Sequence, residues 1–198
     1  MRCDMRISLV MLAAGNSRRF GSNKLLYEIG GEPMYRHILT QLECVCRELM
    51  RRGIRSDITV VTQYEAIAAA ARTAGAGVYY NVHPDEGISS SVKIGLLANE
   101  TSDACLFTVA DQPWLTADTI LRLVDTFLKE KKGIACVSTN GKTGNPCIFS
   151  RKYYPELMKL TGDVGGKQVI MAHRQDTAIF PVLDGRELTD LDRPVQAK

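Results

Sequence analysis

The sequence lacks the features that mark several large classes of protein. No apolar run approaches the roughly 20 residues that a helix needs to span a bilayer, so no membrane segment is expected. No Cys-x-x-Cys pair occurs among the six cysteines, and the three histidines are far apart, without the spacing of a metal site. Lysine and arginine form no long run and the net charge is only +3, so no nucleic-acid-binding surface is expected.

The cysteines and the first residues favour a reducing compartment. Cys105 and Cys136 lie in apolar, strand-like runs, where a reduced thiol packs as a small hydrophobic side chain. The apolar stretch that begins at Ile7 is short, and Arg18 and Arg19 follow it closely, which is unlike a secretory signal. We therefore expect a cytoplasmic protein with free thiols.

Strand-like and helix-like segments alternate along the chain. Short apolar runs predict strands over 7–12, 57–62, 77–80, 104–109, 134–138, 146–149 and 178–182. Periodic apolar residues predict helices over 33–52, 64–74, 89–98, 116–130 and 165–174. The alternation predicts an α/β fold whose mostly parallel sheet is covered by helices on both faces. Because no linker or repeat divides the chain, we expect a single domain over 1–198.

The most informative segment follows the first predicted strand. This strand ends in Ala13-Ala14-Gly15, and the residues from there to Lys24 include three basic side chains and no acidic one. Small residues let backbone N–H groups approach an anion, and the cations add charge-assisted hydrogen bonds. The spacing of Gly15, Gly21 and Lys24 fits neither the triphosphatase loop nor the dinucleotide fingerprint. A different phosphate-binding loop is predicted, the alternative being a basic surface loop.

Asp111 is the strongest single candidate for chemistry. It follows the apolar run 106–110 and precedes Gln112-Pro113, so it stands at the carboxyl end of a predicted strand. Ligands of open α/β sheets bind beyond these ends. A carboxylate there can hold Mg²⁺, which takes few protein ligands and keeps substrate phosphates as the others. An aspartate that only caps the turn before Pro113 is the alternative.

Several segments together resemble a known family. The order Leu12-Ala-Ala-Gly-x-Ser-x-Arg-x-Gly-x-x-Lys24 is similar to the opening motif of the nucleotidyltransferases that act on sugar nucleotides and cofactors. Within them it most resembles the molybdenum cofactor cytidylyltransferase branch of the MobA-like family. Further matches follow in order at Lys24–Pro33, Asp111-Gln112-Pro113, Gly144-Asn145-Pro146, Gly162–Gly166 and Asp190–Pro194.

The resemblance implies a fold and an activity. The fold would be three-layered α/β/α with a Rossmann-like, mostly parallel sheet of the nucleotide-diphospho-sugar transferase type. The activity would be Mg²⁺-dependent transfer of CMP from CTP to a molybdopterin-type molybdenum cofactor, with release of pyrophosphate. The nucleotide-binding part would cover about 1–115 and an acceptor-side subregion about 140–175.

The resemblance also assigns roles to residues. Catalytic roles are implied for Lys24, Arg19 and Asp111, and metal binding for Asp111 and Asp192. Contacts with the nucleotide are implied for Leu12, Ala13, Ala14, Gly15, Ser17, Arg19, Lys24, Asn81, Gly87, Ser91 and Asp111. Contacts with the acceptor are implied for Gly144, Asn145, Pro146, Gly162, Asp163 and Gly165. The serines that precede Val92 are equally typical of a helix start.

Three positions differ from the patterns seen in related families. Ala14 stands where guanylyl-transferring relatives carry glycine, and its methyl group would narrow the base pocket toward a pyrimidine. Asn145 stands where the family often has histidine. Asp192 is followed by Arg193-Pro194-Val195 in place of the usual Thr-Pro-Glu.

Other functions remain open at this point. One is guanylyl or cytidylyl transfer to another phosphorylated acceptor, such as a sugar or polyol phosphate. Another is a non-catalytic accessory protein of molybdenum hydroxylases. If the chain is instead catalytic, a molybdenum hydroxylase is a possible client protein. A non-catalytic homologue would be expected to lose Asp111 or Asp192, and this chain retains both.

Overall fold

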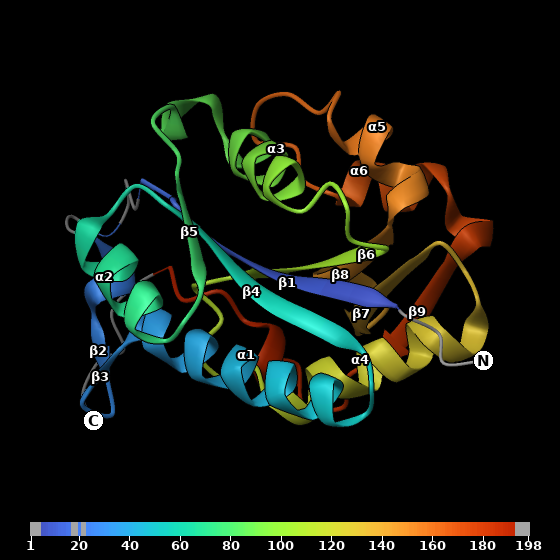
Figure 1. Cartoon of the computed structure of the whole chain (residues 1–198), viewed down its shortest axis with the longest axis horizontal. Helices are drawn as coiled ribbons and strands as arrows, with labels where there is room; N and C mark the ends of the chain where they lie inside the picture. The colour runs from blue at the N-terminus through green and yellow to red at the C-terminus, as the bar shows by residue number, and fades with distance from the viewer. Residues whose placement is uncertain (1–4, 17–19, 21–22, 193–198) are drawn as a thin grey trace.

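A seven-stranded sheet forms the centre of the molecule (Figure 1). The computed structural model of the chain describes residues 5–16, 20 and 23–192. The strands of the sheet are β1 (Arg6–Ala13), β4 (Arg55–Thr62), β5 (Gly77–Tyr80), β6 (Ala104–Val109), β7 (Ile134–Thr139), β8 (Lys142–Ser150) and β9 (Thr177–Pro181). Strands β2 (Glu28–Ile29) and β3 (Glu32–Pro33) form a separate small hairpin.

The helices connect these strands. The α-helices are α1 (Met34–Arg51), α2 (Glu65–Thr73), α3 (Ile88–Ala98), α4 (Ala117–Glu130), α5 (Tyr154–Leu157) and α6 (Lys167–Ala172). The short 3-10 turns are η1 (Lys24–Leu26), η2 (Pro84–Glu86), η3 (Arg151–Tyr153), η4 (Arg174–Asp176) and η5 (Gly185–Leu188). No helix in the described part of the chain is both long and apolar enough to cross a membrane.

The sheet is mostly parallel, as predicted. Its strand order is β5-β4-β1-β6-β8-β7-β9. Strands β5, β4, β1 and β6 pair in parallel, and β7 pairs in parallel with β9. Only β8 runs antiparallel to its neighbours β6 and β7 within this sheet. The carboxyl ends of β1, β4 and β6 therefore meet at one edge of the sheet, where a ligand site is expected.

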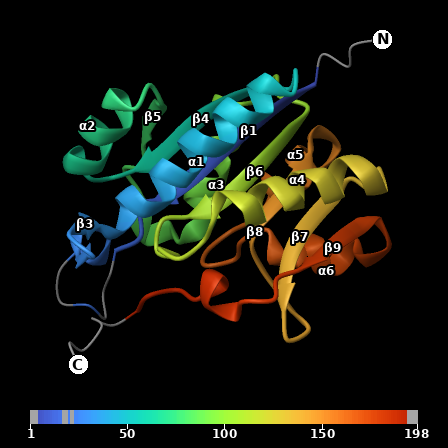
Figure 2. The ribbon, with the colours of Figure 1, turned by 90° about the horizontal axis from the view of Figure 1, so that it is seen from below.

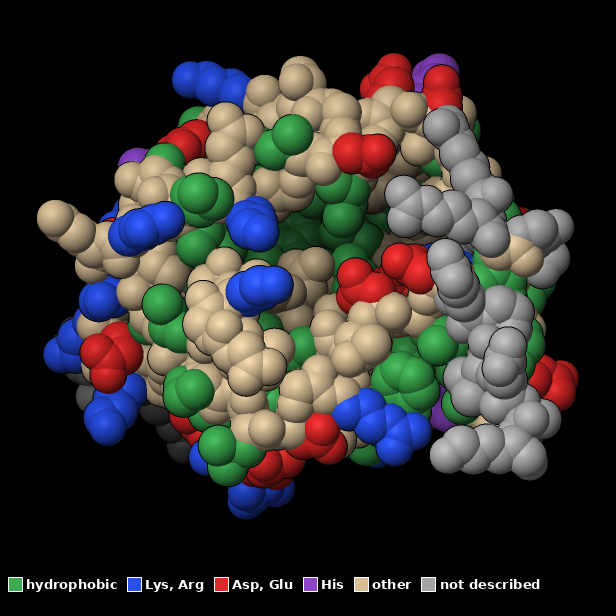
Figure 3. All heavy atoms as spheres, turned by 180° about the vertical axis from the view of Figure 1, so that it is seen from behind, with side chains coloured by type: hydrophobic (Ala, Val, Ile, Leu, Met, Phe, Trp, Pro, Cys, Tyr) green, Lys and Arg blue, Asp and Glu red, His purple; other side chains and the backbone are tan. Residues whose placement is uncertain are grey.

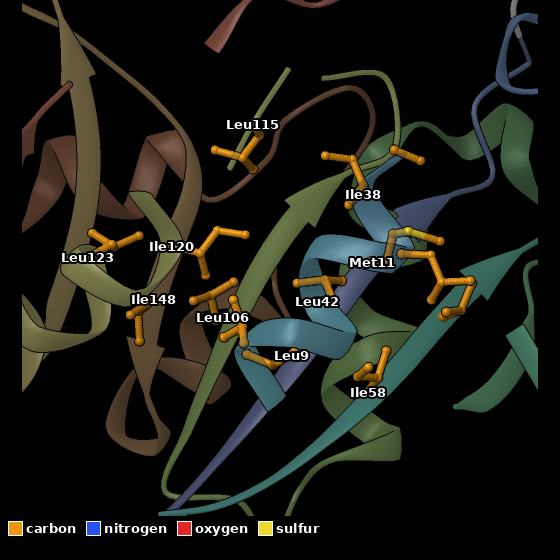
Figure 4. Close-up of a cluster of buried hydrophobic side chains, with 14 of the residues drawn as sticks. Leu9, Met11, Ile38, Leu42, Ile58, Leu106, Leu115, Ile120, Leu123 and Ile148 are labelled. Atoms are coloured by element: carbon orange, nitrogen blue, oxygen red, sulfur yellow. The ribbon is translucent and has the colours of Figure 1, made fainter. Parts of the chain in front are cut away.

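Helices cover both faces of the sheet (Figures 1 and 2). Helices α1, α2 and α4 lie on one face, and α3, α5 and α6 lie on the other. The alternation of side chains in β1 supplies both cores, because Leu9 and Met11 join one apolar cluster while Val10 and Leu12 join the other. Figure 4 shows the first cluster, in which Leu9 and Leu106 from the sheet lie beside Leu42 from α1.

The largest difference from the predicted elements lies between β7 and β8. The sequence predicted a short strand over 146–149, whereas β8 begins at Lys142. Asn140 and Gly141 both have positive φ, 49° and 73°, and form the two-residue turn of a β-hairpin. The sequence pair Asn-Gly is a known signal for this turn and was missed. Helix α5 and the β2–β3 hairpin were also not predicted.

The five described cysteines are free thiols. Cys105, Cys136 and Cys147 are buried, and burial raises the pKa of Cys105 to about 12 and that of Cys136 to about 11. Thiols with such high pKa values stay protonated and unreactive at neutral pH. These three cysteines therefore act as small core side chains, as predicted for Cys105 and Cys136.

Candidate active site

The candidate site lies at the carboxyl ends of β1 and β6. In the parallel pairing of these strands, Leu12 lies opposite Val109, and the Ala110 N–H donates to the Leu12 carbonyl at 3.0 Å. Strands β1 and β6 therefore end side by side at the same edge of the sheet. The loop that begins at Ala14 and the carboxylate of Asp111 emerge side by side, because parallel strands in register end at the same edge.

Lys24 brings two carboxylates together at this edge. Its Nζ lies 2.7 Å from Oδ2 of Asp111 and 2.9 Å from Oδ1 of Asp192. Burial opposes the charge on Lys24, but the two carboxylates outweigh this effect and raise the pKa of its ammonium group. The Lys24 side chain is 13% exposed and that of Asp111 is 20% exposed, so this contact is largely shielded from bulk water.

Lys24 is placed by a short local structure. It is the first residue of η1, and the side chain of Asn23 caps this turn by accepting a hydrogen bond from the Leu25 N–H at 3.1 Å. Leu25 is buried in the core under the turn. The apolar anchor and the cap hold the beginning of the Lys24 side chain close to the end of β6.

Asp192 is placed by a segment that we call the C-terminal strap, residues 184–192. The Leu191 N–H donates to the Asp111 carbonyl at 2.9 Å. The Gln112 side chain donates to Asp190 Oδ1 at 2.9 Å and to the Leu188 carbonyl at 3.3 Å. These hydrogen bonds dock the strap against the loop that follows β6, so Asp192 reaches the same place as Asp111.

The beginning of the strap is fixed to the start of α4. Glu187 Oε2 accepts hydrogen bonds from the N–H and the hydroxyl of Thr116, at 3.1 and 2.8 Å. The guanidinium of Arg186 lies over the ring of Trp114, 4.7 Å from its centroid. Thr116 also caps α4 by accepting from the Thr119 N–H. The strap is therefore held by side chains of several kinds along its length.

The residues present fit a magnesium ion. Asp111 and Asp192 already share one cation, the ammonium group of Lys24, so their oxygens converge on a single point of positive charge. In residues 5–16, 20 and 23–192, no group of three or more His, Cys, Asp or Glu side chains could hold a metal. Two carboxylates that leave further positions for phosphate oxygens are the donor set that Mg²⁺ favours.

A cavity of about 290 Å³ opens beside Lys24, and we call it the charged cavity. Figure 3 looks onto the hollowed face of the molecule, where hydrophobic side chains form the floor and acidic side chains stand at the rim. Among the residues predicted to contact a nucleotide, the cavity is lined by Leu12, Ala14, Gly15, Lys24, Gly87, Ser91 and Asp111. The lining residues that sequence reasoning missed are Asn16, Leu25, Pro84, Asp85, Ile88, Val109 and Ala110.

Two of the predicted nucleotide contacts do not reach the cavity. Asn81 is 2% exposed, and its amide nitrogen donates to the hydroxyls of Ser90 and Ser91 at 2.8 and 2.9 Å. Its side-chain oxygen accepts from the His83 N–H. Asn81 therefore supports the wall that carries Ser91. Ala13 is 1% exposed and packs in the core.

Part of the opening motif lies outside the residues that the structure describes. Ser17 and Arg19, both predicted to contact the nucleotide, lie outside the described residues, as do Arg18 and Gly21. Their roles stay predictions.

A second cavity of about 270 Å³ adjoins the first, and we call it the apolar cavity. It contains the predicted acceptor residues Gly144, Asn145, Asp163 and Gly165 in its lining, together with Phe107, Phe149 and other apolar side chains. Pro146 and Gly162 do not line it. Leu12, Ile88 and Asp163 line both cavities, so these residues form the border between them.

The loop 162–166 is joined to the beginning of α3 at this border. The Gly162 carbonyl accepts from the Ser89 N–H at 3.2 Å, and Asp163 Oδ1 accepts from the Ile88 N–H at 3.3 Å. Gly87, just before α3, has a φ of 86°. No side chain caps α3 from the Gly87 position itself. The loop 162–166 therefore supplies hydrogen-bond acceptors for the first N–H groups of this helix.

A family profile and several curated relatives match most of the chain. The family profile described as MobA-like NTP transferase domain matches residues 9–177. The chain is 27% identical over 192 residues to the purine catabolism protein PucB of Bacillus subtilis, with 93% of this chain and 91% of that protein covered. It is 30% identical over 177 residues to a molybdenum cofactor guanylyltransferase of Shewanella sediminis, with 84% and 80% covered.

Solved structures share the fold. A nucleotidyl transferase from Methanothermobacter superposes with a TM-score of 0.76 at 18% identity, covering 94% of this chain and 92% of that one. This likeness confirms the fold expected from the sequence, a three-layer α/β/α arrangement of the nucleotide-diphospho-sugar transferase type.

Proposed function

Because the chain belongs to the MobA-like NTP transferase family, we propose that it transfers CMP from CTP to a molybdopterin-type molybdenum cofactor. The chain is a nucleotidyltransferase by this family relationship. The observation that carries the proposal is the convergence of Lys24, Asp111 and Asp192 beside the charged cavity, which adjoins the apolar cavity. Such an arrangement supports a triphosphate in one cavity and an acceptor in the other.

Lys24 would act on the triphosphate. Its ammonium group is held at the wall of the charged cavity and remains protonated at neutral pH, because its pKa is raised. When a nucleotide binds, the ammonium can donate to phosphate oxygens and neutralise the charge that develops in the transition state. Arg19 is proposed to add a second positive charge.

Asp111 and Asp192 would hold Mg²⁺. The ion, when bound, neutralises phosphate charge and aligns the reacting groups. The chain supplies the two carboxylates for it, and the docking of the C-terminal strap keeps Asp192 beside Asp111.

The chemistry is an in-line displacement. An oxygen of the acceptor's terminal phosphate forms a bond to the α-phosphorus, and the bond from that phosphorus to the β-phosphate oxygen breaks, so pyrophosphate leaves. A phosphate nucleophile is already ionised at neutral pH, so no side chain has to remove a proton. The apolar cavity is proposed to receive the acceptor's heterocycle, which Phe107 and Phe149 could contact.

Cytosine is the proposed base because of Ala14. This residue lines the charged cavity and is 4% exposed, and its methyl group is proposed to limit the room for a base. A purine needs more room there than a pyrimidine does. One methyl group is worth about 1–3 kcal/mol of discrimination, which is enough for a preference but not for absolute selection.

Product analysis tests the proposal. The purified protein would be incubated with Mg²⁺, molybdenum cofactor and either CTP or GTP, and the products identified by mass spectrometry. We expect pyrophosphate and the cytosine dinucleotide form of the cofactor. Release of pyrophosphate only with a sugar or polyol phosphate as acceptor would contradict the proposed acceptor.

Guanylyl transfer is the second candidate. The relative from Shewanella sediminis is named a molybdenum cofactor guanylyltransferase, and that name favours GTP. The same incubation separates the two candidates, because only one of them predicts the guanine dinucleotide as the main product.

A client protein and a cellular location are also proposed. A molybdenum hydroxylase is proposed to receive the finished cofactor. A cytoplasmic location is proposed because the five described cysteines are free, as expected in a reducing compartment.

A further inference from the structure

Three consecutive residues at the end of β4 hold three consecutive carbonyl groups of the loop after β1. The Thr62 hydroxyl donates to the Ala13 carbonyl at 3.0 Å. The Gln63 amide nitrogen donates to the Ala14 carbonyl at 2.8 Å, and the Tyr64 hydroxyl donates to the Gly15 carbonyl at 2.8 Å. We call Thr62, Gln63 and Tyr64 the loop clamp.

Within the loop clamp, the Gln63 side chain makes hydrogen bonds to more than one partner. Its amide nitrogen also lies 2.8 Å from Asn16 Oδ1 and 3.3 Å from the Tyr64 hydroxyl. A carbonyl can only accept a hydrogen bond, so the contact with Ala14 fixes which end of the Gln63 amide faces the loop. One side chain therefore bridges two positions of the loop.

The loop clamp stands on a rigid base. Thr62 is the last residue of β4, is fully buried and lies opposite Ala13 in the parallel pairing with β1. Tyr64 directly precedes α2, whose residues Ile67 and Ala71 are buried in the core. Because strand and helix are both fixed by packing, the three side chains can hold the loop in one shape.

The hydrogen bonds of the loop clamp engage carbonyl groups of the loop and leave its N–H groups out. The carbonyls of Ala14 and Gly15 are engaged by the loop clamp. In the described part of the chain, the N–H groups of Gly15 and Asn16 donate to no protein group. Both residues are exposed and line the charged cavity, and a β-carbon built at Gly15 would meet nothing within 4 Å. Their N–H groups are thus available to acceptor atoms of a ligand.

We propose that Gln63 is a positioning residue for the nucleotide, because it holds the loop so that the N–H groups of Gly15 and Asn16 donate to the bound nucleotide. This inference rests on the proposed function only in taking a nucleoside triphosphate as the ligand. Gln63 itself touches no reacting atom. Its loss therefore weakens nucleotide binding and leaves the chemical step of the bound complex nearly unchanged.

Two substitutions at one position test the inference. Gln63→Glu keeps the shape but replaces both N–H donors by oxygen, which is repelled by the Ala14 carbonyl. Gln63→Met keeps the length and removes the donors without adding charge. Gln41→Glu is the matched control, since Gln41 lies on α1 and its oxygen accepts from the Ala117 N–H, a role that a carboxylate can keep.

Binding is measured by calorimetry with non-hydrolysable analogues of CTP and GTP in the presence of Mg²⁺. We expect the Kd of the better analogue to rise about tenfold or more for Gln63→Glu and about three- to tenfold for Gln63→Met. Gln41→Glu should bind like the wild type. In turnover assays, KM for the nucleotide should rise by a similar factor while kcat changes less than about twofold.

The outcomes separate the inference from the proposed function. If both Gln63 variants lower the Tm but bind the analogue as tightly as the wild type, Gln63 serves stability alone and the inference is overturned. If the wild-type protein binds neither analogue, the proposed function falls together with the inference. Weaker binding by both variants, at an unchanged Tm and an unchanged kcat, supports the positioning role.

Discussion

Gly87 lies against the backbone of Gly162, so that a β-carbon built at Gly87 would come within 2.4 Å of the Gly162 carbonyl carbon and 2.5 Å of its oxygen. Gly87 belongs to the charged cavity, and Gly162 begins the loop that lines the apolar cavity. The backbone segments that line the two cavities therefore touch between Gly87 and Gly162, and this contact requires glycine at position 87.

This contact predicts the effect of Gly87→Ala. Gly87 has a φ of 86° and a ψ of −177°, a region that essentially only glycine adopts and that costs an alanine about 1–3 kcal/mol, and the close approach to Gly162 adds to that cost. We expect a lower Tm and weaker binding of both substrates. Gly75→Ala is the control, since Gly75 has a φ of 76° but no atom within 4 Å of its β-carbon position. Equal losses of stability in the two variants would show that the contact with Gly162 is unimportant.

Removing a carboxylate from the proposed metal site should stop turnover. Asp111→Asn is expected to lower kcat by at least about a hundredfold, or about 2.7 kcal/mol, while the protein stays folded. Asp190→Asn is the control, because an asparagine oxygen can still accept from Gln112. Turnover and Mn²⁺ binding, followed by electron paramagnetic resonance, are measured on both. Near-normal turnover of Asp111→Asn would remove this residue from the mechanism.

The basic residues of the first loop should contribute unequally. Lys24→Ala and Arg19→Ala are expected to weaken triphosphate binding about tenfold or more, whereas Arg18→Ala should have a smaller effect, since only Lys24 and Arg19 stand at basic positions of the family motif. Calorimetric titration with a non-hydrolysable nucleotide measures this. Three equal losses would instead indicate a diffuse basic surface.

Ala14 should influence the choice of base. We expect the wild type to prefer CTP to GTP and Ala14→Gly to narrow this preference by about fivefold or more, because one methyl group is worth about 1–3 kcal/mol of discrimination. The measurement is the ratio of kcat/KM for the two nucleotides with one acceptor. A wild-type preference for GTP would rule out the cytidylyl assignment, and an unchanged ratio in the variant would show that Ala14 does not contact the base.

Acid should lower the free energy of unfolding of the protein through Asp176. Hydrogen bonds from Lys152 and Tyr153 lower the pKa of Asp176 to about 2, from an ordinary value of 3.8. A carboxylate with a lowered pKa in the folded state adds stability above pH 3.8, and this contribution is lost as the pH falls toward 2. Urea unfolding of the wild type and Asp176→Asn should therefore differ at pH 6 and converge near pH 2. A difference that stays constant over this range would contradict the assignment.

Local sequence signals predicted the elements that position the site. The strands 77–80 and 104–109 were predicted with the bounds that the structure has, because each is an apolar run between residues that interrupt regular structure. The position of Asp111 at a strand end followed from the same reasoning. The predicted helix ends at 52 and 74 lie within one residue of the ends of α1 and α2, where Gly53 and Gly75 follow with positive φ.

Contacts between distant segments could not be predicted in this way. Nothing near Gln63 in the sequence shows that its amide reaches the loop after β1, since that contact depends on the register of β1 with β4. The burial of Asn81 depends in the same way on the packing of α3 over its side chain. The sharing of Lys24 between Asp111 and Asp192 depends on the docking of the C-terminal strap.

The C-terminal strap has a consequence for synthesis of the protein on the ribosome. The nine strands of the described residues and the residues that line both cavities precede the strap in the sequence, so they can begin to fold before Asp192 has left the exit tunnel. A nascent chain at that stage could bind a nucleotide but would lack the second carboxylate of the proposed metal site. Catalytic competence would then be acquired only once the strap has docked.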